Sequence, residues 1–529
     1  MKNFLITLIL TISFGAFADP ILDYQNPKDI FSVANLYDWK YLLHYENNKS
    51  IMVDRSFFLS PNGMNNPSDE LEKTIQEYIK PTFTGENDVI CRFPARVSFI
   101  KKHFNLPKRK NEPKCSAYKE YRKKVKADDV FVVFAGENNT APSSMMGHLF
   151  LKLSGNVNGI TREHSFSFLA TFEQNVSVLT YAKMLLNIID GYYMLSPYQS
   201  SVDTYIYGEK RSLWEFKLIL NDEEKEKLLQ HLWELKEKKL TYDFITHNCG
   251  NATIKLLEIA NTNIIEDSTK PWTTPTEHLK KLIDNNRVKN ISLLPSEDYK
   301  KKIKKTGEIK DITDTYPSSK ISLGYQHNLN NYITLNFRPV YMDISEPNHL
   351  YYDDLETRLF SFDFKYGLKE KNIILDKIDI LKMKSIIDFL TDYTYSKDFK
   401  ISFENKLGEE KTHIRPVVEF GMGTGISILN NTKMYVLPKV GYRYDHFHNL
   451  YLTPEIGVIS NIGKKSKTII SYEHYIDFKE NNRGYNKKIS TSFVYKLNKI
   501  YSLELNFNRY FETKNKNSNE FWIRAGISF

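Results

Sequence analysis

The C-terminal part of the chain, from about Ser318 to Phe529, is a series of segments in which apolar and polar residues alternate. Examples are residues 332–337, 359–366 and 501–507, and turns rich in Asn, Asp, Gly and Lys separate the segments. Because successive side chains of a strand point to opposite faces, each segment predicts a strand with one apolar face. There are about twelve such segments, an even number that suits a closed antiparallel β-barrel in a membrane.

A soluble β-sandwich or a small lipocalin-like barrel is the alternative for this region. The membrane barrel is favoured because no second sheet is available to cover the apolar face of each strand. The last segment, residues 520–529, ends in phenylalanine after alternating apolar residues. This ending resembles the C-terminal signature of bacterial outer-membrane barrels. Tyrosine and phenylalanine are abundant, at 34 and 33 residues, and those near the predicted strand ends suit the aromatic girdles of such barrels.

The N-terminus has the pattern of a secretory signal peptide over residues 1–18. Lys2 precedes an apolar stretch at residues 4–14, and Ala16-Phe17-Ala18 is a small-x-small cleavage sequence. No later run of about 18 uncharged apolar residues predicts a spanning helix. We therefore expect an exported protein, with the barrel in the outer membrane and the preceding domains in the periplasm.

The charge pattern bears on the class of partner. The chain has 73 basic and 64 acidic side chains, for a formal net charge of +9. The lysines are scattered among acidic residues, and no basic stripe alternates with aromatics, so nucleic acid is excluded as a partner. A mild attraction to anionic lipid headgroups is compatible with this charge.

Three cysteines are present: Cys91, Cys115 and Cys249. In an oxidising compartment an even pair tends to form a disulfide, and Cys91 and Cys115 lie close together in one segment rich in Lys and Arg. We therefore predict a Cys91–Cys115 disulfide and a free thiol at Cys249. The alternative for Cys249 is a small buried apolar side chain without chemistry.

Residue patterns divide the rest of the chain into regions. Residues 68–78 predict a helix in a helix-rich N-terminal region, whereas residues 130–135 are an apolar run that predicts a buried strand. Asn221 is the predicted cap of a helix with an apolar stripe. The lysine-rich run at residues 300–305 predicts a solvated linker. The predicted divisions are residues 19–127 (helical), 128–290 (α+β), 291–315 (charged linker) and 316–529 (antiparallel β-barrel).

Two residues of the α+β region carry the chemistry. Cys249 opens the predicted helix at residues 249–257, where unpaired N–H groups and the helix dipole favour the thiolate form. His148 opens an alternating strand and could take up and return a proton. The histidine precedes the cysteine, which is the reverse of the order in papain-like enzymes, so such a site requires a circularly permuted papain-like fold. A strand histidine with only a structural role is the alternative for His148.

Neighbouring residues are candidates for the supporting roles. We expect His164, on the next strand, to orient His148, with Asn248 as the second choice. Asn248 also suits an oxyanion or turn role beside the backbone N–H of Cys249, and Arg211 is a candidate supporting residue.

Two other assignments were considered for these histidines and the cysteine. His247 is an alternative base, although adjacent residues seldom point into one pocket. A zinc site is ranked below thiol catalysis, because no two candidate ligands have the short spacing of common zinc sites. No cofactor or metal is expected.

Several ordered pieces of the middle region resemble the Lnb N-terminal periplasmic domain family, typified by the lipoprotein intramolecular transacylase. The pieces are Pro142-Ser143-Ser144, Gly147-His148-Leu149-Phe150-Leu151, residues 209–215, residues 231–235 and residues 242–249. The resemblance implies a permuted papain-like fold, an active pair at His148 and Cys249, and acyl chemistry on amides or esters near a membrane. Ser144 is counted among the supporting residues.

The expected function is that of an outer-membrane-anchored thiol acyltransferase or hydrolase. Its expected donors are lipid, lipoprotein or peptidoglycan peptide, in that order. The alternative is a barrel scaffold or channel whose periplasmic domain only binds a partner, with Cys249 inert.

Overall fold

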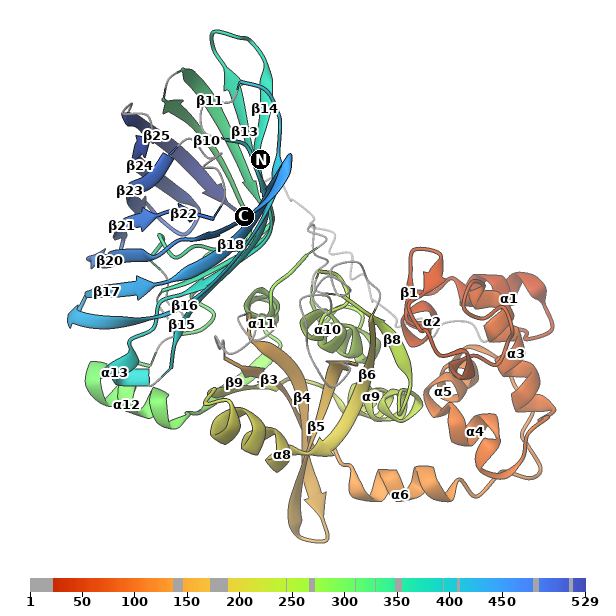
Figure 1. Ribbon diagram of the computed structural model, residues 1–529. Helices are drawn as coiled ribbons and strands as arrows, with labels where there is room; N and C mark the ends of the chain where they lie inside the picture. The colour runs from red at the N-terminus through yellow and green to blue at the C-terminus, as the bar shows by residue number, and fades with distance from the viewer. Residues whose placement is uncertain are drawn as a thin grey trace, which may run out of the picture.

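The computed structural model describes residues 22–136, 146–171, 189–243, 245–265, 272–309, 311–328, 330–347, 354–392, 394–406, 410–478, 485–512 and 517–529. The predicted signal peptide and Ser144 lie outside these residues. The chain forms an N-terminal group of helices, a middle domain around a sheet, and a C-terminal barrel (Figure 1). None of the described helices is both long and apolar enough to cross a bilayer.

The N-terminal region is helical, as the sequence predicts. Asparagine side chains cap two of its helices, each of which has proline at its first position, the arrangement that suits a helix start. The helices are α1 (Pro27–Ala34), α2 (Tyr37–Leu42), α3 (Pro67–Ile79), α4 (Val89–Arg92), α5 (Pro94–His103) and α6 (Ser116–Lys124), with short helices η1 (Arg55–Phe57) and η2 (Gly85–Asn87) and a hairpin of β1 (Tyr45–Glu46) and β2 (Lys49–Ser50).

The middle domain is built on an antiparallel seven-stranded sheet of order β8-β6-β5-β4-β3-β7-β9. Its strands are β3 (Asp129–Ala135), β4 (His148–Val157), β5 (Ile160–Ala170), β6 (Ile189–Pro197), β7 (Leu213–Leu218), β8 (Lys239–Tyr242) and β9 (Val288–Leu294). Its helices are α8 (Tyr198–Val202), the π-helical turn η4 (Asp203–Gly208), α9 (Asp222–Glu234), α10 (Cys249–Ala260) and α11 (Pro275–Asp284). This confirms the mixed α/β middle region, while its circular permutation stays a prediction.

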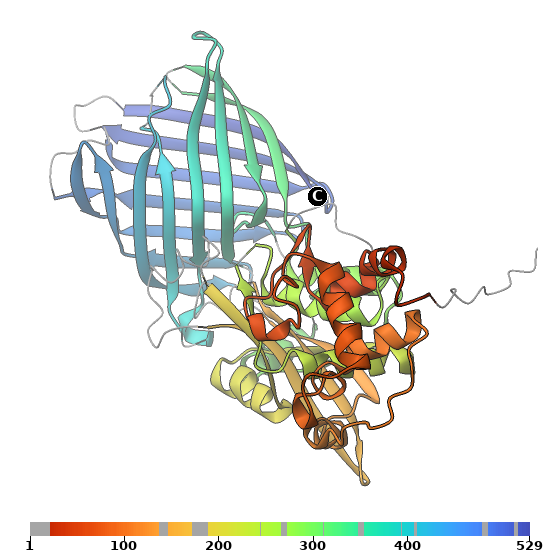
Figure 2. The same ribbon diagram turned by 90° about the vertical axis from the view of Figure 1, so that its right-hand side faces the viewer.

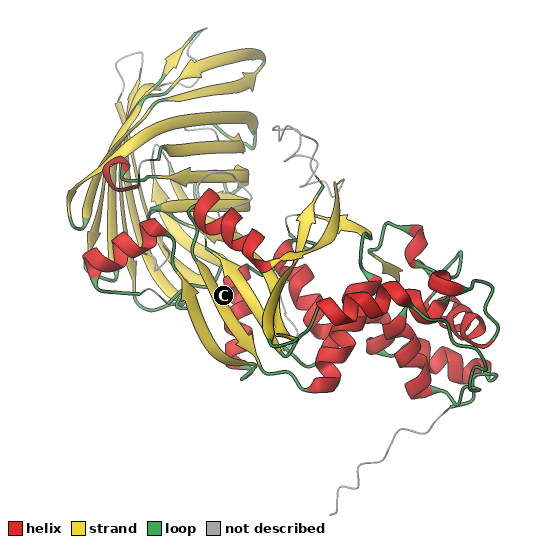
Figure 3. Ribbon diagram, turned by 90° about the horizontal axis from the view of Figure 1, so that it is seen from below, coloured by secondary structure: helices red, strands yellow, loops and turns green. Residues whose placement is uncertain are grey.

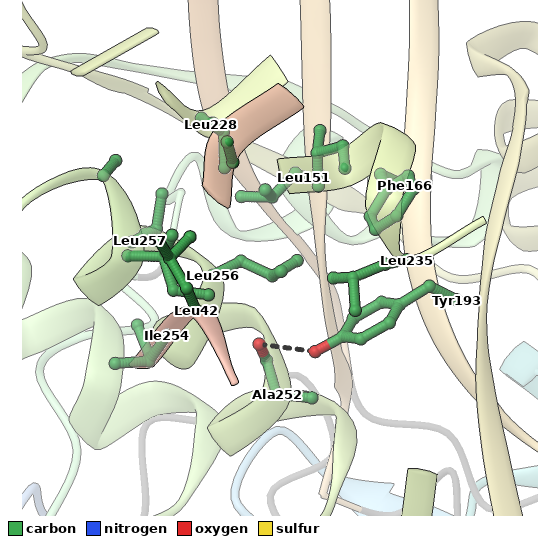
Figure 4. Packing of buried hydrophobic residues seen from close by; sticks show 14 of the residues in the cluster. Leu42, Leu151, Phe166, Tyr193, Leu228, Leu235, Ala252, Ile254, Leu256 and Leu257 are labelled. Atoms are coloured by element: carbon green, nitrogen blue, oxygen red, sulfur yellow. Dashed lines mark hydrogen bonds between the residues drawn. The ribbon is translucent and has the colours of Figure 1, made fainter. Parts of the chain in front are cut away.

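The two faces of this sheet bury different cores. Alternate residues of β4, such as Leu149 and Leu151, pack against α9 and α10 in the larger cluster, part of which Figure 4 shows. There the Tyr193 hydroxyl donates to the Ala252 carbonyl over 3.1 Å, which ties β6 to α10. The opposite face carries a smaller cluster in which Phe150 packs with residues of α8 and η4.

The charged segment after the middle domain is not the solvated linker that its lysines predict. Residues 288–294 form β9, which pairs with β7, and α12 (Glu297–Thr306) follows. Tyr299 of α12 is buried, and its ring meets Trp214 edge-on at a centroid distance of 5.5 Å. The lysines misled the prediction because a helix with one buried face still exposes its charged face.

The C-terminal region is a closed barrel of twelve antiparallel strands, as the sequence predicts. Closure comes from pairing of the first strand with the last, β10 with β25. Four of the twelve strands are interrupted and carry two labels along their length: β11–β12, β17–β18, β19–β20 and β21–β22. The elements are β10 (Lys320–His327), β11 (Asn331–Arg338), β12 (Val340–Met342), β13 (Leu355–Gly367), β14 (Ile373–Ser385), α13 (Phe389–Asp392), β15 (Ser396–Glu404), β16 (Arg415–Leu429), β17 (Thr432–Leu437), β18 (Lys439–Asp445), β19 (Phe447–Leu452), β20 (Glu455–Ile462), β21 (Ser466–His474), β22 (Ile476–Asp477), β23 (Tyr485–Lys496), β24 (Tyr501–Glu512) and β25 (Asn517–Ser528).

The two faces of the barrel wall differ as a membrane requires. Apolar side chains such as Phe420 and Ile470 are exposed on the outside, at 47 and 50 %. Ion pairs cross the interior, such as those of Lys439 with Glu455 and Glu473 at 2.9 and 2.8 Å. An apolar outer belt around a polar interior is the arrangement of a transmembrane barrel.

The barrel rests on the middle domain, and the N-terminal helices lie at the far side of that domain (Figures 2 and 3). Trp272 Nε1 donates to Ser319 Oγ over 2.9 Å, and the backbone N–H of Ser318 donates to the Glu277 carboxylate over 3.1 Å. Glu277 also completes the capping box of α11 with Thr274, so the helix start and the barrel entry share one carboxylate.

The predicted disulfide joins Cys91 and Cys115 across 24 residues, and Cys249 is free. Replacing both bridged cysteines with alanine should lower the free energy of unfolding of the N-terminal region by about 3 kcal/mol, since the bridge restricts the unfolded chain. Susceptibility of the N-terminal region to protease, titrated with denaturant in the full chain, measures this change. Reduced wild type should match the double variant, and an unchanged midpoint in both would contradict the prediction.

Candidate functional site

The free thiol lies at the start of α10. Asn248 is the N-cap, and its side-chain oxygen accepts the backbone N–H of Asn251 over 3.0 Å. Backbone N–H groups of Leu149, Gly250 and Cys249 itself are directed at the sulfur. Asn248 therefore has the turn role, one of its three predicted roles, and the sulfur lies among several N–H donors.

Burial controls the protonation of this thiol. Loss of solvent raises the pKa of Cys249, and the three N–H groups together with Arg211 lower it by less. The helix start therefore does not favour the thiolate as expected, because desolvation outweighs the dipole. The resting residue is a neutral thiol that needs a base.

His148 is the first residue of β4. Its ring stacks with Tyr205 at a centroid distance of 5.9 Å and lies the same distance from Phe150. Its Nε2 is buried and has no hydrogen-bond partner among the described residues. Burial, helped by the Arg211 charge, lowers the pKa of His148 to about 3. The imidazole is therefore neutral at physiological pH and holds a nitrogen free to take a proton.

Two contacts and one electrostatic interaction place the thiol and the imidazole at the same strand end. The N–H of Leu149, next to His148 in the chain, is directed at the sulfur. Thr253 Oγ1, one turn after Cys249, donates to the Leu149 carbonyl over 3.2 Å. Burial raises the pKa of Tyr205, and the nearby Cys249 raises it further. The ring of Tyr205 stacks on His148.

His164 does not meet the pair, contrary to the expectation that it orients His148. The strands do pair, but His164 lies opposite Leu153, five residues along β4 from His148. That is a separation of about 16 Å at ~3.3 Å per residue. His164 also shares the face of Leu153, whereas His148 shares the opposite face with Ala135. Local alternation predicted both strands correctly but could not give their register.

His247 points away from the thiol. Its Nδ1 contacts the Asp243 carboxylate, and its Nε2 lies 3.0 Å from Glu46 of the N-terminal hairpin. Glu46 in turn pairs with Lys255. These partners occupy both ring nitrogens, so the alternative of His247 as the base is not supported.

Arg211 holds the strand next to His148. Its guanidinium donates to the carbonyls of Ala135 and Gly136 and pairs with Glu209 at 2.8 Å. It also lies over the Tyr205 ring, 5.0 Å from the centroid. Since Ala135 pairs with His148, Arg211 fixes the strand end and the stack that position the imidazole.

Three contributors were not predicted from the sequence. Tyr205 comes from a π-helical turn, and the N–H of Leu149 is a backbone group, so neither has a sequence signal. His278 Nε2 binds Asn251 Oδ1 at 2.6 Å, and Asn251 donates to the carbonyls of residues 245 and 246. His278 thereby fixes the loop before the nucleophile, and only tertiary packing could show it.

A cavity opens beside Cys249, between the middle domain and the barrel. One side comes from the middle domain and the other from the outer wall of the barrel. Its lining is Met146, Gly147, Tyr242, Ile245, Asn248, Cys249, Trp272, Thr273, Thr274, Pro275, Val340, Thr357, Leu359, Leu381 and Met383.

Gly147 offers a test of the strand end. Its φ is +82°, and a Cβ there would lie 2.2 Å from a ring carbon of Phe134. Gly147→Ala should therefore displace His148, lower the rate of any reaction at Cys249 by at least about tenfold, and destabilise the domain. Gly159 has the same φ with open space around it, so Gly159→Ala should cost only about 1 kcal/mol and leave the rate unchanged. Equal rates in the two variants would contradict this role.

Comparisons with known proteins agree with this architecture. Residues 117–285 match the family model of the Lnb N-terminal periplasmic domain. Residues 32–103 and 315–525 match domains of unknown function, DUF7843 and DUF7840. No curated protein matches the chain.

Solved structures similar to the barrel include the KdgM porin with disordered oligogalacturonate, the NanC porin and an outer membrane channel from Pseudomonas putida F1. They are 8, 8 and 9% identical to this chain, cover 40, 40 and 42% of it and 99, 100 and 100% of their own chains, and have TM-scores of 0.26, 0.26 and 0.28.

A closed antiparallel barrel with an apolar outer wall and a charged interior, joined to a separate α/β domain, defines an outer-membrane protein with a periplasmic domain. Residues 117–285 of this protein, which include that domain, match the family model of the Lnb N-terminal periplasmic domain. The resemblance drawn from the sequence is confirmed for this part of the chain.

Proposed function

We propose that this protein is an outer-membrane-anchored thiol acyltransferase or hydrolase that acts on an ester or amide of lipid, lipoprotein or cell-wall material. The observation that carries the proposal is the neutral imidazole of His148, with a free Nε2, at the strand end whose next N–H is directed at the Cys249 sulfur. The family match of residues 117–285 supports acyl chemistry near a membrane.

The reaction follows from these groups. As the sulfur attacks the acyl carbonyl carbon, the thiol proton passes to His148 Nε2. The N–H groups around the sulfur, from Leu149, Gly250 and Cys249, stabilise the negative charge on the carbonyl oxygen. The intermediate collapses with breakage of the bond to the leaving oxygen or nitrogen, which takes the proton from His148. Water or an amine then attacks the thioester and releases the thiol.

The alternative of a channel for charged solutes is less well supported. Among the described residues, the central hollow of the barrel is lined by eleven basic and eleven acidic side chains, so it has no excess of either charge. Ion pairs link them across the space, such as Lys384 with Glu455 at 2.7 Å. A lumen cross-linked in this way favours a role as anchor, since pores for charged solutes line their path with one sign of charge.

Trapping of an acyl-enzyme tests the proposed function. The full chain, folded in detergent, is incubated with diacyl phospholipid, diacylated lipopeptide or a peptidoglycan peptide, and peptides are analysed by mass spectrometry. A thioester adduct on the peptide that holds Cys249, absent in Cys249→Ala, is the expected result. Lack of an adduct with every donor, in protein whose fold is intact, would overturn the proposal.

A further inference from the structure

The cavity beside Cys249 takes one of its walls from the barrel. Five barrel residues contribute, all on β12 to β14: Val340, Thr357, Leu359, Leu381 and Met383. Alternation shows that this is the outer surface, because Glu356 and Arg358 beside them on β13 line the lumen. The cavity is therefore bounded by the surface that faces lipid elsewhere around the barrel.

This part of the outer wall is covered rather than bare. Leu359 and Met383 are 6 and 5 % exposed, because Met146 and Trp272 of the middle domain pack over them. The equivalent outward residues on strands away from the middle domain are about half exposed. The wall of the cavity is thus continuous with the lipid-facing belt.

The cavity lies at the end of the barrel that the chain enters from the periplasmic domain. Trp272 lines it and donates to Ser319, the residue before β10. A tryptophan with its ring in an apolar pocket and its N–H bonded to a polar partner is typical of the boundary between bilayer and water. Trp272 is thus placed as a residue at the periplasmic edge of the bilayer would be.

One polar atom in this apolar wall lacks a partner. Thr357 Oγ1 is buried without a hydrogen bond among the described residues, and the side chain lines the cavity. A buried hydroxyl that pairs with nothing costs free energy, so it marks a place where a ligand oxygen fits. The thiol therefore lies in the same cavity as an apolar wall and a single unused donor.

We propose that the barrel wall at β12 to β14 is half of the substrate site, and that it binds an acyl chain of a glycerophospholipid that enters sideways from the periplasmic leaflet. The acyl chain of the lipid packs on Leu359, Leu381 and Met383, and the Thr357 hydroxyl donates to an ester oxygen. This rests on the proposed function. The Cys249 sulfur then bonds to the ester carbonyl carbon, the carbon–oxygen bond breaks, and the lysophospholipid leaves with the proton that His148 took from the thiol.

The continuity of the wall with the lipid belt selects the phospholipid over other donors. A phospholipid already in the leaflet reaches the cavity by lateral diffusion, with its chain against protein surface throughout. A water-soluble peptide would not gain binding energy from the apolar half of the site. A lipoprotein acyl chain shares the chemistry, so the experiment distinguishes the two sources.

Binding is tested first in a variant that cannot react. Full-length Cys249→Ala in vesicles receives a phospholipid with a photoreactive group at the end of one acyl chain. Crosslinks to residues 340–342, 355–367 or 373–385 are expected, and excess unlabelled phospholipid should compete them away. If a diacyl lipopeptide competes and unlabelled phospholipid does not, the site belongs to lipoprotein and the phospholipid assignment is overturned. Crosslinks spread evenly around the barrel would overturn the site itself.

Chain preference is tested in the reactive protein with matched substitutions. Leu359→Trp fills the cavity and should lower acylation by long-chain phospholipid at least about tenfold relative to short-chain phospholipid, whereas Ile470→Trp on the open lipid-facing wall should change neither. Thr357→Val should lower the rate, and Thr357→Ser should restore it. Identical behaviour of the two tryptophan variants would overturn the inference. Failure of the proposed function would instead abolish adducts in wild type while leaving the crosslinks intact.

Discussion

Replacement of His148 with alanine should lower the rate of Cys249 acylation by a factor of about 10² to 10⁴, the usual contribution of a positioned general base. The thiol is neutral because burial raises its pKa, so loss of the imidazole removes the proposed base for its proton. Rates of thioester formation measured by mass spectrometry give the comparison. His164→Ala, on the opposite face of the sheet, is the control and should keep the wild-type rate.

The pH profile separates a base from a structural residue. Because burial lowers the pKa of His148 to about 3, the base stays deprotonated from pH 5 to 8. The acylation rate should therefore show no loss between pH 7 and 5, where an ordinary histidine would become protonated. Alkylation of Cys249 should be slow at neutral pH and rise above the usual thiol range, since its pKa is raised. A fall in rate centred near pH 6.5 would contradict this view of the site.

The second large effect is expected at Arg96, which joins the N-terminal helices to the middle domain. Its guanidinium lies 2.7 Å from Glu70 and 3.6 Å from Glu234, with all three side chains fully buried. The rings of Phe57 and Phe93 lie 4.1 Å from it. Arg96→Met would leave two buried carboxylates without their cation, and should cost about 3 to 5 kcal/mol.

Susceptibility to protease of the N-terminal region, titrated with urea in the full chain, measures this loss. Arg122→Met is the control, because Arg122 pairs with Glu226 at 2.6 Å in a partly exposed position and should cost less than about 1 kcal/mol. Equal losses of unfolding free energy in the two variants would show that the buried network stabilises the protein no more than an exposed ion pair does. The pKa of Glu234, which burial raises to about 7, indicates that desolvation is severe here.

Local sequence patterns predicted the helices and strands, but they did not predict which residues of different elements lie close together. Period-two alternation predicted the barrel and its number of strands, and the Asn221 cap with its apolar stripe predicted α9. The apolar run after Cys249 predicted α10. Each of these signals is read within about ten residues.

What failed depends on register and on tertiary contacts. The pairing of β4 with β5 was foreseen, yet a shift of a few residues moved His164 away from the site. The protonation state of Cys249 was misjudged because burial is not visible in a helix-start motif. The barrel residues that line the cavity are about 100 positions away from Cys249 in the sequence, so no local pattern could show that they lie beside it.

Closure of the barrel has a consequence for when the protein can act. The last strand to leave the translocation machinery, β25, pairs with β10, so the wall is complete only after the whole chain has arrived and inserted. If β12 to β14 form half of the substrate site, a molecule still in transit to the membrane is dormant. Maturation of the anchor would thus switch on the chemistry, and thioester formation would be confined to its destination.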